Sequence, residues 1–286
     1  MNLNTTKEKT ALVVCDIQSD QLGSFTKPQR ENLLLSLRIP IEAARSNHWL
    51  VVYSGLKFPS RYAGVPSNHK LYGGLYKLNT KLGDDAVHWF MDGWDGSKIV
   101  TKDVDPIVSP NDEDVIVWRS QHVPYELATL LKQRDITKAY IVGVKASGSI
   151  QITCQVLMDQ GIQVSAIKEC IQDDKEDRLH ATINHILPIY ANVLTLKEMM
   201  ENVGGIERFS TESKDILIHL LSSNGNESES DKYLLASNCG RRGHGSRYIQ
   251  LLQERGGWKM YPTQIWYEDF IHQYHCPLAK KVNIKP

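Results

Sequence analysis

The sequence predicts an α/β fold, namely a doubly wound, mostly parallel sheet with helices on both faces, followed by a C-terminal extension. Three observations lead to this prediction. Short apolar runs alternate with amphipathic segments of helical length up to about residue 200. These lengths suit right-handed crossovers between parallel strands. Polar residues stand directly after several of the apolar runs, at the sheet edge where open α/β folds bind ligands.

The expected elements follow one another in chain order. A buried strand spans 10–15 because the run is continuously apolar, and a helix spans 28–46, where proline lies near the start and leucines share one face. Residues 56–96 are too long for a simple connection, so we expect a functional excursion there, and its many aromatic residues favour a planar ligand. The remaining expected strands are 49–55, 114–118, 138–144, 162–169 and 191–196, and the remaining expected helices are 125–135, 147–161 and 175–187.

The composition does not indicate a protein that binds nucleic acid, spans a membrane or is secreted. Apolar residues make up 41% of the 286 residues, which is enough for a sizeable core, and 33 Lys and Arg balance 33 Asp and Glu. This balance gives no indication of a nucleic-acid or strongly acidic partner. No apolar run reaches the roughly 18 residues of a membrane span, and none forms a signal-peptide core. The five cysteines show no CxxC spacing, so we expect reduced thiols and a cytoplasmic protein.

Three groups of polar residues lie at the ends of predicted strands. Asp16 follows the first strand, Arg119 follows the third, and residues 145–149 (KASGS) follow the fourth. The carboxyl ends of parallel strands share one edge of the sheet, so these residues should meet in one crevice. An Asp–Arg–Ser set suits the binding of an anionic group better than nucleophilic attack, because arginine cannot act as a base.

Four segments carry a resemblance to a known family. They are ALVVCDIQSD (11–20), DVIVWRSQHVPYELATLL (114–131), YIVGVKASGSIQITCQVLMDQGIQV (140–164) and KECIQDDKEDRLHATI (168–183). In order, spacing and placement at strand ends, the chain over roughly residues 8–200 resembles the isochorismatase-like hydrolases. That superfamily includes nicotinamidases, N-carbamoyl amidohydrolases and isochorismatases. The resemblance implies the same α/β fold and a hydrolase that acts on a small molecule.

The resemblance also implies which residues are catalytic. The family uses an Asp after the first strand, a Lys after the third and a Cys that opens the helix after the fourth. Those positions hold Asp16, Arg119 and Ser149 here, so two of the three are changed. We predict these three as the catalytic residues. The family's cis peptide would be Val144–Lys145, and the amides of Lys145 and Ser149 would form its oxyanion hole.

Four further residues are predicted to contact the substrate, and they are Gln18, His122, Val144 and Lys145. Gln18 belongs to the D-x-Q pattern after the first strand, and His122 follows closely on the basic residue after the third. Lys145 stands where the family prefers a small residue. Its side chain could enter the site in place of the missing lysine or point to solvent.

The two replacements change the chemistry. A cysteine becomes a thiolate after a modest lowering of its pKa from about 8.5, which a helix N-terminus and a lysine can supply. A serine hydroxyl is far less acidic and needs a general base within hydrogen-bonding reach. Asp16 is the only candidate base in the set, because Arg119 stays protonated.

Two functional hypotheses remain open. In the first, the chain is a hydrolase of a small carboxylate, amide or vinyl ether, with Asp16 as the acid/base and Arg119 as an anion clamp. Either Ser149 then replaces the thiol, or Asp16 protonates the substrate and water completes the cleavage, as in the vinyl-ether-cleaving isochorismatases. In the second, the chain is a catalytically degenerate member that acts as a binding or scaffold protein.

No cofactor is predicted. Nicotinamidases of the family carry an Asp-x-His…His metal set after the second strand, whereas this chain has only His69 there and lacks the Asp, so no metal site is expected. No nucleotide-binding glycine pattern lies between a strand and a helix. The expected partner is a small-molecule substrate rather than a membrane or a nucleic acid, and the resemblance implies a homo-oligomer.

The chain is expected to have three regions. A hydrolase domain spans 1–205, a helix and a polar linker span 206–231, and a basic and aromatic extension spans 232–286. The extension holds a basic stretch, CGRRGHGSRY, and an aromatic segment, WKMYPTQIWYEDFIHQY, whose large residues recur at helical spacing. The aromatic segment could seal a subunit contact, cover the crevice or pack on its own domain, and these alternatives stay open.

Overall fold

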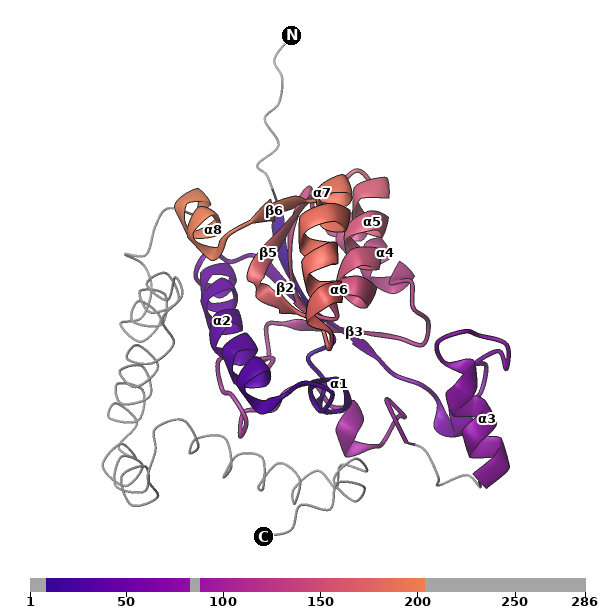
Figure 1. Ribbon diagram of the computed structural model, residues 1–286. Coiled ribbons are helices and arrows are strands. Elements are labelled where there is room, and N and C mark those ends of the chain that lie inside the picture. Colours follow the sequence, from indigo (N-terminus) through magenta and orange to yellow (C-terminus); the bar gives the residue numbers. More distant parts are fainter. Residues whose placement is uncertain (1–8, 83–87, 204–286) are drawn as a thin grey trace, which may run out of the picture.

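The computed structural model describes residues 9–82 and 88–203 of the chain (Figure 1). Its centre is one sheet of six strands, all parallel, in the order β3-β2-β1-β4-β5-β6. The strands are β1 (Thr10–Cys15), β2 (Leu50–Leu56), β3 (Val115–Arg119), β4 (Lys138–Val144), β5 (Gln163–Gln172) and β6 (Asn192–Leu194). The order reverses between β1 and β4, which is the switch point where such sheets bind ligands. The predicted doubly wound, parallel architecture is confirmed.

Helices cover both faces of the sheet (Figure 1). The longer helices are α2 (Lys27–Ser46), α3 (Gly73–Leu82), α4 (Tyr125–Gln133) and α5 (Gln151–Asp159), and the shorter ones are α1 (Ser19–Leu22), α6 (Glu176–Ala181), α7 (Leu187–Tyr190) and α8 (Leu196–Asn202). The helices α2 and α8 share one buried apolar cluster with the sheet, and α4, α5 and α7 share another. Strand side chains alternate between these clusters, so that Leu12 faces α2 and Val13 faces the α4–α5 side.

Three of the differences between the observed and the expected elements affect the helices α5 to α8. The expected helix 147–161 begins with a π-helical turn, Ala146–Ile150, before α5. A second π-helical turn, Thr182–Ile186, separates α6 from α7 within the expected helix 175–187. The expected strand 191–196 is shorter because Thr195 is instead the N-cap residue of α8. The Thr195 side chain accepts a hydrogen bond from the Glu198 amide, and the Glu198 carboxylate accepts one from the Thr195 amide, which forms a capping box.

Residues 57–82 and 88–97 form the predicted excursion between β2 and β3. This excursion has a small apolar cluster of its own, separate from the two clusters on the sheet, and it consists of Leu56, Phe58, Tyr62, Val65, Phe90 and Met91. Gln18 ties both ends of the excursion together. Its Nε2 donates to the carbonyls of Leu56 and Ser97 at 2.7 and 2.6 Å, and its Oε1 accepts from the Leu56 amide at 2.8 Å.

Among the residues that the structure describes, every helix is too short or too polar to cross a lipid bilayer. The predicted helix and linker 206–231 and the extension 232–286, with its basic and aromatic stretches, lie outside the described residues.

We expect Gln18→Leu to lower the free energy of unfolding by about 2–4 kcal/mol, measured by urea denaturation. The change removes the partner of two buried carbonyls and one buried amide, and an unsatisfied buried group costs about 1–3 kcal/mol. Gln21→Leu is the control, because it makes the same change at a partly exposed position of α1 and should cost under about 0.5 kcal/mol. Equal losses in the two variants would contradict the assigned role of Gln18.

Candidate active site

Three strand ends position the predicted catalytic side chains. Asp16 follows β1, Arg119 is the last residue of β3, and Ser149 lies in the π-helical turn after β4. Asp16 has a φ of 51°, in the left-handed region that aspartate tolerates better than most residues. Gly143 in β4 has a φ of 115°, and a Cβ there would lie 2.2 Å from the carbonyl oxygen of Cys15. Glycine therefore allows β4 to lie close against β1 at this end of the sheet.

The side chains of Asp16, Arg119 and Ser149 contact one another directly. Nη2 of Arg119 donates to Oδ1 and Oδ2 of Asp16 at 2.7 and 2.5 Å, and to Oγ of Ser149 at 2.8 Å. The Ser149 hydroxyl donates to Oδ2 of Asp16. Nη1 of Arg119 donates to the carbonyl of Gln121 at 3.1 Å, which orients the guanidinium plane. The strand-end residues thus meet as predicted, and we refer to these three as the Asp–Arg–Ser triad.

The triad is almost entirely buried. Asp16 is 1% exposed, Arg119 is 3% exposed and Ser149 is 5% exposed. Burial alone would lower the pKa of Arg119, but the adjacent Asp16 carboxylate raises it, and the pKa lies above its usual value. The guanidinium therefore stays charged and cannot accept a proton. Each member of this ion pair compensates the buried charge of the other, as a buried pair requires.

Cys15, which precedes Asp16, does not replace the thiol that the triad lacks. Its side chain belongs to the apolar cluster under α4 and α5 and contacts the Thr153 hydroxyl at 3.9 Å. Burial and the neighbouring Asp16 charge raise the pKa of the Cys15 thiol to about 12. The thiol is therefore protonated near neutral pH and is a poor nucleophile.

The turn after β4 carries Ser149 on a well-anchored backbone. The Val144–Lys145 peptide bond is cis, as the family resemblance implies. Two residues later, the amide and the hydroxyl of Ser147 donate to Oδ2 of Asp173 at 2.8 and 2.7 Å. Asp173 is fully buried at the end of β5, so these hydrogen bonds tie the turn to the neighbouring strand.

The side chains of three of the four predicted substrate contacts have partners within the protein. Gln18 is fully buried, and its amide holds the backbone ends of the excursion. The Val144 side chain is fully buried in the cluster on the α2 face. Lys145 neither enters the triad nor points freely to solvent, because its Nζ pairs with Oδ2 of Asp174 at 3.2 Å. Lys145 therefore does not substitute for the family's lysine.

The fourth predicted contact, His122, lines a hollow of about 340 Å³. The walls come from the excursion (63–66, His69 and Tyr72) and from residues 120–123 and Tyr125 after β3, and they include no member of the triad. Oη of Tyr72 lies 3.3 Å from Nδ1 of His122. Burial raises the pKa of Tyr72 and lowers that of His122, and the Arg119 charge lowers both. The hollow is thus adjacent to the triad but separated from it.

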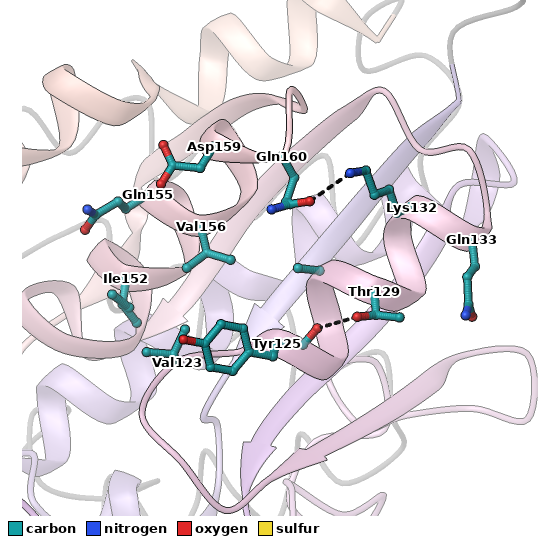
Figure 2. Close-up of a pocket in the computed structure, with 11 residues that line it drawn as sticks. Val123, Tyr125, Thr129, Lys132, Gln133, Ile152, Gln155, Val156, Asp159 and Gln160 are labelled. Carbon is teal, nitrogen blue, oxygen red and sulfur yellow. Dashed lines mark hydrogen bonds between the residues drawn. The ribbon is translucent and has the colours of Figure 1, made fainter.

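A second hollow, of about 570 Å³, lies between α4 and α5 (Figure 2). Figure 2 shows Lys132 and Gln160 joined across one end by a 2.9 Å hydrogen bond from Nζ to Oε1. Tyr125 lines both hollows, but none of the predicted site residues lines this one. Of these two hollows, the one of about 340 Å³ that His122 lines is therefore the one associated with the predicted site residues.

The sequence analysis missed two residues near the triad. Tyr72 is one of many aromatic residues in the excursion, and nothing in the sequence distinguishes it from the others. Asp173 belongs to the charged run DDKED, which is typical of a solvated segment, although its side chain is fully buried. A buried partner within a charged run has no sequence signal, because burial depends on contacts with the turn after β4.

Within the described residues, no three His, Cys, Asp or Glu side chains are arranged to hold a metal ion. His69 lies close to the site, but its Nδ1 accepts hydrogen bonds from the amides of Leu71 and Tyr72, both at 3.2 Å. His69 therefore shapes the start of α3.

Known proteins resemble this chain in sequence and in fold. A sequence model of the isochorismatase domain matches residues 10–198. Similar solved structures include an isochorismatase family protein from Desulfovibrio vulgaris (15% identity, TM-score 0.54), the zinc complex of the pyrazinamidase of Pyrococcus horikoshii (15%, 0.51) and N-carbamoylsarcosine amidase from Thermoplasma acidophilum (17%, 0.51). They cover 68%, 66% and 70% of this chain and 98%, 99% and 99% of their own chains. No curated protein matches the chain significantly.

At these identities the solved structures show a shared fold alone. The domain match adds sequence similarity over well over half of the chain, and its limits enclose all six strands and the triad. The chain therefore belongs to the isochorismatase family of hydrolases.

Proposed function

We propose that the chain is an isochorismatase-like hydrolase that cleaves a small carboxylate, amide or vinyl-ether substrate without a covalent intermediate. Asp16 is the acid/base of this reaction. The observation that supports the proposal is the position of the Asp16 carboxylate at the switch point of the sheet, in contact with both Arg119 and Ser149. This position is the one where open α/β sheets hold their reacting groups.

A covalent route through Ser149 fits the contacts less well. Its hydroxyl would have to lose a proton to a base within reach. Arg119 cannot accept that proton, and the Asp16 carboxylate already accepts hydrogen bonds from both neighbours. Ser149 then acts as a fixed hydrogen-bond donor that orients Asp16.

In the proposed reaction, protons pass through Asp16 alone. With a vinyl ether, protonated Asp16 gives its proton to a substrate carbon, water adds to the resulting cation, and the proton lost by water returns to the carboxylate. The hemiketal then breaks its C–O bond, and its hydroxyl proton passes through Asp16 to the leaving oxygen, which gives a carbonyl compound and an alcohol. With an amide, the carboxylate takes a proton from the attacking water and gives it to the leaving nitrogen. Each route consumes one water molecule and regenerates Asp16.

Arg119 keeps the predicted role of anion clamp only through the guanidinium hydrogens that Asp16, Ser149, Gln121 and Tyr72 leave unused. Its main proposed role is to hold the Asp16 carboxylate in one orientation. The amides of Lys145 and Ser149, which flank the cis peptide at the start of the turn, are the proposed donors to a developing oxyanion.

The second candidate is a catalytically degenerate family member that binds a small molecule or serves as a scaffold. The way in which the triad side chains bond to one another favours this second candidate. All three side chains are buried and bonded to one another, and the adjacent hollow is lined by none of them.

The proposed partner is a small-molecule substrate, and the proposed assembly is a homo-oligomer in the cytoplasm. The cysteines in the described part of the chain are free and buried, which suits a reducing compartment. Tyr125 and Ile189, on the α4–α7 side of the sheet, are 61% and 63% exposed, and a second copy is proposed to cover them.

We expect Asp16→Asn to lower kcat by about 10²–10⁴-fold, the usual contribution of a general acid or base. Ser149→Ala should retain turnover within about tenfold, because no bond forms to Oγ. The measurement is product formation by the full chain from isochorismate, nicotinamide and N-carbamoyl substrates, followed by chromatography.

Equal losses in the two variants would contradict the non-covalent route and indicate a serine nucleophile. A wild-type chain that binds one of these compounds, turns over none, and still binds after Asp16→Asn would establish the second candidate instead. Urea midpoints for both variants provide the control for folding.

Arg119→Met should lower the free energy of unfolding by about 3–5 kcal/mol, because it leaves the Asp16 carboxylate buried without its partner. Arg134→Met removes an exposed arginine after α4 and should cost under about 0.5 kcal/mol. Adding Asp16→Asn to Arg119→Met should recover part of the loss, because no buried charge then remains. A loss no larger than that of Arg134→Met would contradict the buried ion pair.

A further inference from the structure

The candidate active site has two separate parts, which are the buried triad and the hollow beside it. The triad is buried, and none of its side chains lines the hollow of about 340 Å³ beside it. Tyr72 of the excursion and His122 of the loop after β3 both line the hollow, and both are close enough to Arg119 for its charge to shift their pKa values. A molecule in the hollow therefore contacts this pair before it can contact the triad.

The His122 ring covers the turn that carries Ser149. A Cβ added to Gly148 would lie 3.7 Å from Cε1 of His122, so the imidazole packs over the residue before Ser149. Burial and the Arg119 charge lower the pKa of His122, so the ring is neutral near pH 7. Its Nδ1 can then accept a hydrogen bond from the Tyr72 hydroxyl 3.3 Å away.

Tyr72 is held mainly by its own excursion. Its ring packs edge-on against Phe58, with centroids 4.9 Å apart, and stacks on His69 at 5.0 Å. On the triad side, its described contacts are polar and involve His122 and Arg119. The Tyr72–His122 hydrogen bond joins two neutral groups and contributes little net stability, because water can replace either partner.

The excursion is built so that Tyr72 can move without disturbing the sheet. Its apolar cluster is separate from the two clusters that hold the helices on the sheet. Gln18 ties its two ends, at Leu56 and Ser97, to the end of β1. Movement within the excursion can therefore change the position of Tyr72 while Asp16 and the strand ends stay in place.

We propose that Tyr72 is the gate of the candidate active site. In the closed position its side chain, latched to His122, separates the hollow from the triad. In the open position the latch is broken, and the hollow becomes continuous with Asp16 and Ser149. The role of this gate in catalysis rests on the proposed function of the triad. Whether Tyr72 blocks access to the triad can be tested without measuring enzyme activity.

The test uses a thiol introduced at position 149 as a reporter of access. Full-length Ser149→Cys is treated with iodoacetamide, and alkylation at position 149 is followed by tandem mass spectrometry, which distinguishes it from alkylation at Cys154 nearby. We expect slow alkylation in Ser149→Cys alone and at least tenfold faster alkylation after Tyr72→Ala. Tyr72→Phe, which removes only the latch hydroxyl, should give an intermediate rate and keeps the test valid if the alanine variant folds poorly.

Tyr125→Ala is the matched control, because Tyr125 also lines the hollow but is 61% exposed and begins α4 instead of belonging to the excursion. It should change the alkylation rate by less than about twofold. Cys154, fully buried on α5, reports global opening in the same experiment. An unchanged rate after Tyr72→Ala, an equal effect of Tyr125→Ala, or a parallel rise at Cys154 would each overturn the gate. None of these results depends on whether the chain is a hydrolase.

Discussion

A single guanidinium group joins the ends of three strands in this protein. Arg119 ends β3, and its Nη2 atom reaches Asp16 after β1 and Ser149 after β4. The strands β3 and β1 are separated by β2, so the contact spans the width of two strand spacings. A buried carboxylate is tolerated only with a compensating charge. The local structure at the switch point therefore depends on this ion pair.

The same interaction limits the chemistry of the site. A lysine at position 119 would supply a compact charge on a flexible stem, whereas arginine presents a planar fork that binds a carboxylate firmly and never loses its proton. Arginine and serine stand where the family resemblance places a lysine and a cysteine, so the triad has neither the thiol nor the titratable amine. The remaining group that can exchange a proton in the triad is Asp16. This explains why the two surviving functions are acid/base hydrolysis through Asp16 and binding without catalysis.

Access to the triad is controlled by a different part of the chain from the one that builds it. The triad is carried by the sheet, whose two apolar clusters fill both faces. The barrier above it comes from the excursion, which has its own cluster and is tied to the sheet by Gln18. This division resembles the general separation of a rigid scaffold from loops that control entry. It also explains why the side chain of Gln18, in the D-x-Q pattern, bonds to the backbone at both ends of the excursion.

The sequence by itself determined the architecture and the identity of the triad. Apolar runs that alternate with segments of helical length indicate a parallel sheet covered by helices, and the carboxyl ends of its strands place Asp16, Arg119 and Ser149 at one edge. The sequence could not predict what each side chain bonds to. The burial of Gln18, the pairing of Lys145 with Asp174 and the position of Tyr72 over the triad arise from contacts between distant segments. Periodicity and local motifs report which face of an element is buried, whereas the partner on that face is decided only when the segments pack together.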